Sequence, residues 1–163
     1  MTRLVPALAL AATIVLAGGT ISFAQTAPAQ IVKERQDAMK KMWPDFYKAI
    51  AVSIRSGNPD LPLIAAQAAK AGEHLKTVAQ LFPPGTGRDV VPTTRAKPEI
   101  WTQRAEFEAT LTALVDATKA IGDDAKSGNV DKVKADWTTL AKACGGCHGG
   151  PEKSGGKFRF EED

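Results

Sequence analysis

The sequence predicts an all-α fold, an antiparallel four-helix bundle with up-down-up-down topology. Apolar residues recur at helical spacing in four segments of the chain. Turns rich in glycine, proline and asparagine separate these segments, and no segment alternates apolar and polar residues as a half-buried strand does. Two consecutive helical hairpins form such a bundle, in which side chains from facing helices fill the core.

The first helix is predicted from about Gln30 to the turn at residues 56–59. Pro44 lies within this helix and has no backbone N–H for a helical hydrogen bond. We therefore expect a kink or a brief break near residues 40–43. The apolar face of this helix carries Ile31, Met39, Met42, Phe46, Ile50 and Ile54.

The second helix is predicted to begin after Asp60, a residue type that caps helix N-termini. The sequence Pro83-Pro84-Gly85-Thr86-Gly87 ends this helix. The connection that follows, to about Lys97, is polar and interrupted, and we expect an ordered surface loop. The apolar face of the second helix carries Leu61, Ile64, Ala68, Ala71, Leu75, Val78 and Phe82.

The third helix is predicted to begin at Pro98, since proline is favoured in the first turn of a helix, and to end at residues 127–129. Its apolar face carries Ile100, Phe107, Leu111, Leu114 and Ile121. Asn129 can cap a fourth helix. The apolar face of that helix carries Val130, Val133, Trp137, Leu140, Ala141 and Cys144.

The last predicted helix ends in the sequence Cys144-Gly145-Gly146-Cys147-His148. Two thiols at this spacing can each add across one vinyl group of a haem, and the adjacent imidazole can then bind the iron. A disulfide gives no reason for the histidine, and a zinc site would need a fourth ligand, for which the chain offers only His74. The pattern therefore predicts one covalently bound haem c, attached through Cys144 and Cys147, with His148 as an iron ligand.

The N-terminus has the pattern of a secretory signal peptide. A basic start at Arg3 precedes the largely apolar residues 4–21, and small residues precede a predicted cleavage after residue 24. A retained membrane anchor is the alternative, because the apolar stretch approaches the length of a membrane span. We expect residues 1–24 to be removed and residues 25–163 to form a single domain in the periplasm.

The charge pattern argues against several partner classes. Removal of the signal peptide takes away one cation, so the net formal charge falls from +3 to about +2. No long basic run is present, so we expect neither nucleic acid nor, after cleavage, a membrane as a partner. No pair of carboxylates suggests acid–base catalysis, and we expect that the protein is not an enzyme.

Three further segments accompany the haem motif: Glu34-Arg35-Gln36-Asp37-Ala38-Met39, Leu81-Phe82-Pro83-Pro84-Gly85-Thr86-Gly87 and Arg95-Ala96-Lys97-Pro98-Glu99-Ile100-Trp101. With them the mature chain resembles the class II c-type cytochromes, which comprise the cytochrome c-prime group and its low-spin relatives of the cytochrome c-556 type. The resemblance implies that the residue four after the first-helix arginine decides the iron coordination. Met39 holds this position relative to Arg35. The implied second axial ligand is therefore Met39, with Met42 as its substitute, and Arg35 is implied to contact a haem propionate.

The implied function is electron transfer, in which an exported six-coordinate haem protein meets a redox partner protein transiently. Dimers are common in this family, so a homodimer is a further expectation. The alternative is a five-coordinate haem protein that binds nitric oxide or carbon monoxide.

Two side-chain placements complete the expectations. His74 stands beside the apolar face of the second helix, and we expect a surface imidazole there rather than an iron ligand.

In the family an aromatic residue and an arginine usually follow the haem-binding histidine closely. Here residues 149–157 intervene before Phe158-Arg159, which leaves two alternatives: these residues fold back on the haem edge, or they form a mobile tail.

Overall fold

The computed structural model describes residues 27–149 and 155–161, so the predicted signal peptide lies outside the described residues. The helices are α1 (Pro28–Met42), the π-helical segment η1 (Trp43–Lys48), α2 (Ala49–Arg55), α3 (Leu61–Ala79), α4 (Glu99–Thr102), α5 (Arg104–Lys126) and α6 (Val130–His148). None of these helices, in the part of the chain that the structure describes, is long and apolar enough to cross a membrane.

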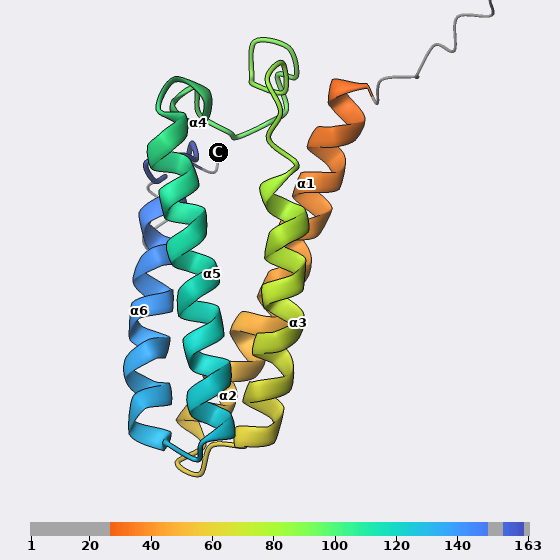
Figure 1. Ribbon diagram of the computed structural model, residues 1–163. Helices are drawn as coiled ribbons and strands as arrows, with labels where there is room; N and C mark the ends of the chain where they lie inside the picture. The colour runs from red at the N-terminus through yellow and green to blue at the C-terminus, as the bar shows by residue number, and fades with distance from the viewer. Residues whose placement is uncertain (1–26, 150–154, 162–163) are drawn as a thin grey trace, which may run out of the picture.

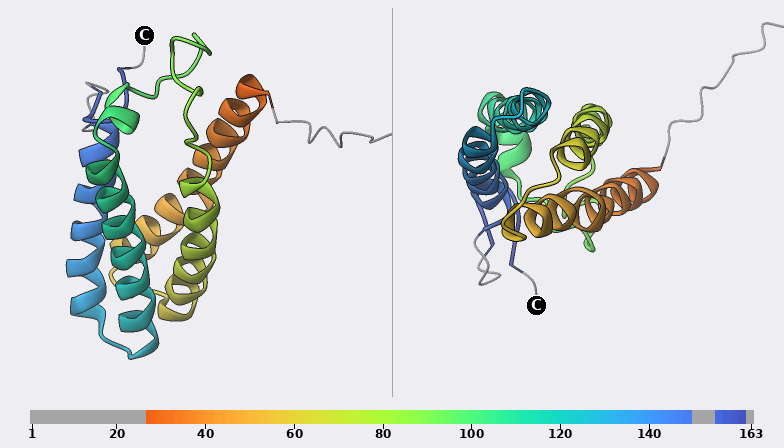
Figure 2. Two further views of the ribbon diagram at one scale, coloured as in Figure 1. Left: turned by 45° about the horizontal axis from the view of Figure 1, so that its top comes forward. Right: turned by 90° about the horizontal axis from the view of Figure 1, so that it is seen from below.

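The helices form the predicted antiparallel four-helix bundle (Figure 1). The first arm runs through α1, η1 and α2, and the other arms are α3, α5 and α6. Successive arms run in opposite directions, which confirms the up-down-up-down topology. Figure 2 shows that the N-terminal end of α1 diverges from α5 and α6. The long connection before α4, the end of α6 and residues 155–161 lie at the same end of the bundle.

The first arm stays helical through Pro44, where a kink or brief break was expected. The chain changes at Trp43 from an α-helix to a π-helix and returns to an α-helix at Ala49. Because Pro44 has no backbone N–H, one α-helical hydrogen bond is missing here in any case, and the wider π turn lets the helix continue. The irregularity therefore begins at the end of the predicted range, at Trp43.

Both predicted N-terminal caps are confirmed. The Asp60 carboxylate accepts a hydrogen bond of 2.9 Å from the Leu63 N–H at the start of α3. The Asn129 side chain accepts a hydrogen bond of 3.1 Å from the Lys132 N–H at the start of α6. Each cap satisfies a backbone donor that has no partner within its own helix.

The third arm differs from the prediction of one helix from Pro98. The short helix α4 ends at Gln103, whose φ of −119° and ψ of 47° are not helical, and α5 begins at the next residue. The Trp101 indole N–H donates to the Pro83 carbonyl oxygen at 3.0 Å. This bond ties α4 to the end of the second arm, and the direction of the chain changes at Gln103.

Most of the bundle is held together by one apolar cluster, here called the central cluster. The helices approach closely within it, since a Cβ added at Gly122 of α5 would lie 3.2 Å from the Cβ of Ala68 in α3. The predicted apolar faces supply all of its members except Ala117 and Ala125. The members are Phe46, Ile50, Ile64, Ala68, Ala71, Ala117, Ile121, Ala125, Val133 and Leu140.

Replacement of the cap residue in Asp60→Ala should lower the free energy of unfolding by about 1 kcal/mol, because the Leu63 N–H loses its acceptor. Urea unfolding followed by circular dichroism measures this change. The control is Asp116→Ala, an exposed position within α5, where a change of less than about 0.5 kcal/mol is expected. Equal effects of the two substitutions would show that the cap contributes nothing specific.

Candidate haem site

The haem motif occupies the last turn of α6, as predicted. Cys144 and Cys147 are both half-buried, and they are not bonded to each other. His148 is half-buried and is the last residue of the helix. The spacing places Cys147 and His148 three and four residues after Cys144, so the three side chains share one helix face.

The two cysteines lie against different parts of the core. Cys144 packs against the central cluster, and Cys147 packs against a second cluster at the end of the bundle. The ring centroids of Phe82 and Phe107 are 4.9 Å apart, and those of Phe107 and Phe158 are 5.2 Å apart. This second cluster, here called the aromatic cluster, consists of Val78, Phe82, Ala96, Ile100, Phe107 and Phe158.

The two candidate sulfur ligands, Met39 and Met42, pack against different clusters. Met39 is half-buried and packs, together with Cys147, against the aromatic cluster. Met42, one turn later, packs with Cys144 against the central cluster. The structure therefore brings Met39 to the cluster that also contacts Cys147, next to His148. Iron ligation by either sulfur stays a prediction.

Arg35 of α1 is buried, with an exposed fraction of 4%, and it holds the long connection to the first helix. Its Nη1 donates to the Leu81 carbonyl oxygen at 3.0 Å and to Thr86 Oγ1 at 3.2 Å. Its Nη2 donates to the Thr86 carbonyl oxygen at 3.1 Å and to Thr94 Oγ1 at 2.7 Å. The guanidinium also lies over the Phe82 ring, 4.6 Å from the centroid.

These contacts limit the further hydrogen bonds that Arg35 can donate. Both terminal nitrogens are engaged, so Nε–H is the donor left for a further acceptor. Burial lowers the pKa of the Arg35 guanidinium to about 10, because the charge is taken out of water. A nearby anion would offset this cost. The contact with a haem propionate stays a prediction, and the structure adds a role that the sequence did not indicate, the anchoring of the loop.

The segment after the haem motif folds back on the site. Residues 155–161, here called the return segment, bring Phe158 into the aromatic cluster with an exposed fraction of 2%. Glycines make this path possible: Gly149 has a φ of +88°, and a Cβ added at Gly156 would overlap the carbonyl oxygen of Cys147. The alternative expectation of a mobile tail is therefore wrong for residues 155–161. The two closely spaced aromatic residues Phe158 and Phe160 are the sequence feature that could have indicated this.

Backbone hydrogen bonds connect the return segment to two parts of the chain. The Lys97 N–H donates to the Phe158 carbonyl oxygen at 3.0 Å, and the Phe160 N–H donates to the Arg95 carbonyl oxygen at 2.9 Å. The Phe158 N–H lies 3.4 Å from the Cys147 carbonyl oxygen. The return segment thus ties the long connection to the end of α6.

Burial also changes the acidity of the cysteines. Removal from water raises the pKa of the Cys144 thiol. The pKa of Cys147 rises to about 11, chiefly through burial and further through Cys144, while the positive charge of Arg159 opposes the rise. In both cases burial is the main cause of the shift, and it favours the uncharged thiol over the thiolate.

His74 differs from the expected surface imidazole. The ring is half-buried, and its Nε2 lies 2.8 Å from the carbonyl oxygen of Ala38 in α1. The sequence placed His74 correctly beside the apolar face of α3, but it could not show that the first arm lies within reach of this side chain.

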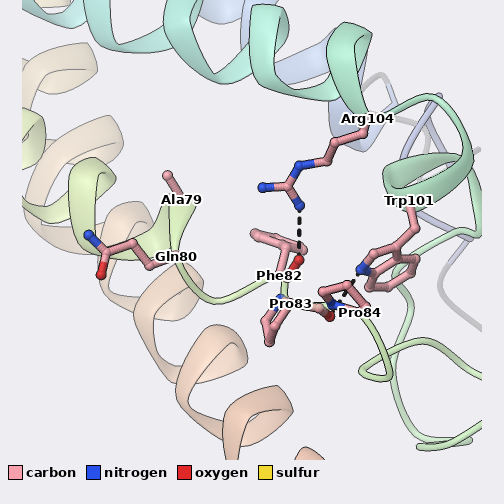
Figure 3. Close-up of a pocket in the computed structure, with 7 residues that line it drawn as sticks. All are labelled: Ala79, Gln80, Phe82, Pro83, Pro84, Trp101 and Arg104. Carbon is pink, nitrogen blue, oxygen red and sulfur yellow. Dashed lines mark hydrogen bonds between the residues drawn. The ribbon is translucent and has the colours of Figure 1, made fainter.

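A cavity of about 360 Å³ lies next to the aromatic cluster (Figure 3). Arg104 donates to the Phe82 carbonyl oxygen at 2.9 Å across this cavity, beside the bond from Trp101 to Pro83. The residues that line it are Ala79, Gln80, Phe82, Pro83, Pro84, Trp101 and Arg104. None of them belongs to the haem motif, so this cavity does not mark the place of attachment.

The donor set fits a covalently attached haem. Two thiols one helical turn apart and an imidazole beside the second thiol are the groups that such a haem requires, and the apolar cluster that contacts Cys147 also contacts the thioether of Met39. The buried ring of Phe158 belongs to the same aromatic cluster that contacts Cys147. A four-helix bundle with this motif on its last helix is the arrangement of a class II c-type cytochrome.

The chain belongs to the cytochrome c' family, whose sequence model matches residues 30–150. The family binds covalently attached haem c, and haem c is the cofactor of this protein.

Individual relatives agree with this assignment. The chain is 32% identical over 126 residues to a cytochrome c' of Alcaligenes xylosoxydans xylosoxydans, an alignment that covers 74% of this chain and 91% of that protein. It is 29% identical over 142 residues to a cytochrome c-556 of Rhodopseudomonas palustris, covering 83% and 93%. Among solved structures, the nitric oxide complex of a cytochrome c prime variant from Alcaligenes xylosoxidans matches with a TM-score of 0.70 and 25% identity, covering 85% and 99%.

Replacement of Arg35 by lysine should loosen the long connection. One ammonium group cannot reach all the oxygens that the guanidinium now bonds, so Arg35→Lys should lower the free energy of unfolding by about 2–4 kcal/mol. Denaturant unfolding of the holoprotein measures the loss. Gln36→Ala is the control, because the neighbouring side chain is exposed and makes one 3.4 Å bond to Thr93. A fully stable Arg35→Lys variant would contradict the anchoring role.

The attachment of the haem can be tested by mass. Mature protein from cells with a working cytochrome maturation system should keep haem on the polypeptide after denaturation, because thioether bonds survive unfolding. The double substitution Cys144→Ser and Cys147→Ser should give a polypeptide without haem under the same conditions. Mass spectrometry of the denatured chains distinguishes these results. Wild-type chain with two alkylatable thiols and no added mass would overturn the assignment.

Proposed function

We propose that the protein is an exported mono-haem electron carrier in which His148 and Met39 are the axial ligands of the iron. In this proposal Cys144 and Cys147 hold the haem by thioether bonds. The observation that carries the proposal is the packing of Met39 with Cys147 against the aromatic cluster, whereas Met42 packs elsewhere. With two protein ligands the iron has no open position for a substrate, and we assign no enzymatic activity.

When bound, the haem supplies a one-electron couple between ferrous and ferric iron. The protein holds both ligands on packed helices, α1 and α6, so little has to move when the charge changes. Cys147 packs against the cluster that holds the buried rings of Phe82, Phe107 and Phe158, which limits the access of water to its inner side. A thioether ligand together with this burial favours the reduced state and raises the reduction potential.

Localisation and partners follow from the same proposal. Export would depend on residues 1–24, and the mature domain would act in the periplasm. It would meet a redox partner protein transiently, without nucleic acid or membrane as a partner, and it could also form a homodimer.

The second candidate is a gas-binding haem protein with five-coordinate iron. The specific observation in its favour is that solved relatives of similar fold are nitric oxide complexes of cytochrome c prime variants. In this candidate Met39 packs at the distal side without binding the iron, and nitric oxide or carbon monoxide occupies the sixth position.

Optical spectra distinguish the two candidates. The electron carrier should show low-spin bands in both oxidation states, with a weak near-infrared band from sulfur-to-iron charge transfer in the ferric form. A high-spin ferrous spectrum that changes at once with carbon monoxide would reject Met39 as a ligand and favour gas binding.

Comparison of Met39→Ala with Met42→Ala should identify the sulfur. Met39→Ala should open the iron, remove the near-infrared band and lower the reduction potential, because the thioether ligand is lost. Met42→Ala should keep the band and should destabilise the fold by about 2–4 kcal/mol, as expected for truncation of a packed side chain. The reverse pattern of spectra would assign the ligand to Met42.

A further inference from the structure

We infer that His74 of α3 is a positioning residue for the Met39 ligand, through its hydrogen bond to the carbonyl group of Ala38. This inference rests on the proposed six-coordinate iron and adds a residue that does not itself touch the haem.

The hydrogen bond joins two arms of the bundle at one point. His74 Nε2 lies 2.8 Å from the Ala38 carbonyl oxygen, across 36 positions of sequence and in a half-buried place. A carbonyl oxygen can only accept, so Nε2 carries the hydrogen and the imidazole is the donor. The donor therefore holds the backbone of α1 one residue before Met39.

This turn of α1 directly precedes the irregular segment of the first arm. The helix changes to the π-helical segment at Trp43, four residues after Met39, and Pro44 contributes no N–H to the hydrogen-bond pattern. On the N-terminal side, Arg35 is fixed to the long connection. His74 supplies a second contact at Ala38, nearer to Met39 and to the irregular segment, so the α-helical turn that leads into Met39 is tied to two other elements.

The orientation of this turn decides which sulfur faces the haem motif. Ala38 and Met39 pack against the aromatic cluster, but Met42 packs against the central cluster. Met42 and His74 also line one cavity of about 180 Å³ between the first arm and α3. A small rotation of the helix at Ala38 would move Met39 away from Cys147, and the bond from His74 opposes that rotation.

The test compares three variants in the holoprotein. His74→Leu keeps the bulk of the side chain and removes the donor, while His74→Gln keeps an N–H at about the same distance from the backbone. Lys70→Leu is the control, since Lys70 is exposed and lines the same cavity without bonding to Ala38. The readouts are the near-infrared sulfur-to-iron band, the rate of carbon monoxide binding to the ferrous form and the hydrogen exchange of the Met39–Met42 amides.

Loss of one hydrogen bond should raise the fraction of molecules with Met39 detached. His74→Leu should therefore bind carbon monoxide about threefold to tenfold faster, with a weaker near-infrared band and faster amide exchange in this turn. His74→Gln should restore the wild-type values, and Lys70→Leu should keep them. Wild-type behaviour of His74→Leu in carbon monoxide binding and exchange would overturn the inference.

Failure of the proposed function would look different. In that case the wild-type protein itself would be high-spin, without the near-infrared band. Exchange of the Met39–Met42 amides would then still show whether His74 holds this turn of α1. Faster exchange in His74→Leu with rescue by His74→Gln would show that it does, and no change would reject it.

Discussion

Phe107 stands where three separate parts of the chain meet. Its ring contacts Phe82 at the end of the second arm and Phe158 in the return segment, and its own helix α5 runs antiparallel to α6. Apolar burial at this point removes all three rings from water, which is the largest favourable contribution that such side chains make. One side of the end of α6, at Cys147, thereby packs against rings from the second arm, from α5 and from the return segment.

The first arm is attached to this end of the bundle by polar contacts. Arg35 bonds to the long connection, and His74 bonds to the backbone beside Met39. Farther along, the π-helical segment carries Tyr47. The centroid of its ring lies 4.6 Å from the ring centroid of Trp137 in α6. Directional contacts at these three places set how α1 faces α6, which apolar packing alone would leave free to slide or rotate.

Several features were readable in the sequence because they depend on neighbours along the chain. The caps Asp60 and Asn129, the apolar faces and the haem motif act over three or four residues, the range of helical hydrogen bonds. Pro44 predicted an irregularity in the first helix. The sequence did not show that the chain would continue through it as a π-helix. The interruption at Gln103 had no local signal, because the bond from Trp101 to Pro83 is formed only when α4 meets the end of the second arm.

The sequence by itself determined the fold class, the covalent haem motif and the membership of a c-type cytochrome class, because helical periodicity and the Cys-x-x-Cys-His spacing are properties of short segments. Only the tertiary structure decided that Phe158 closes the aromatic cluster, that Arg35 anchors the long connection and that His74 reaches Ala38. Those contacts join residues tens of positions apart. They exist only after the arms have packed, so no local pattern can specify them.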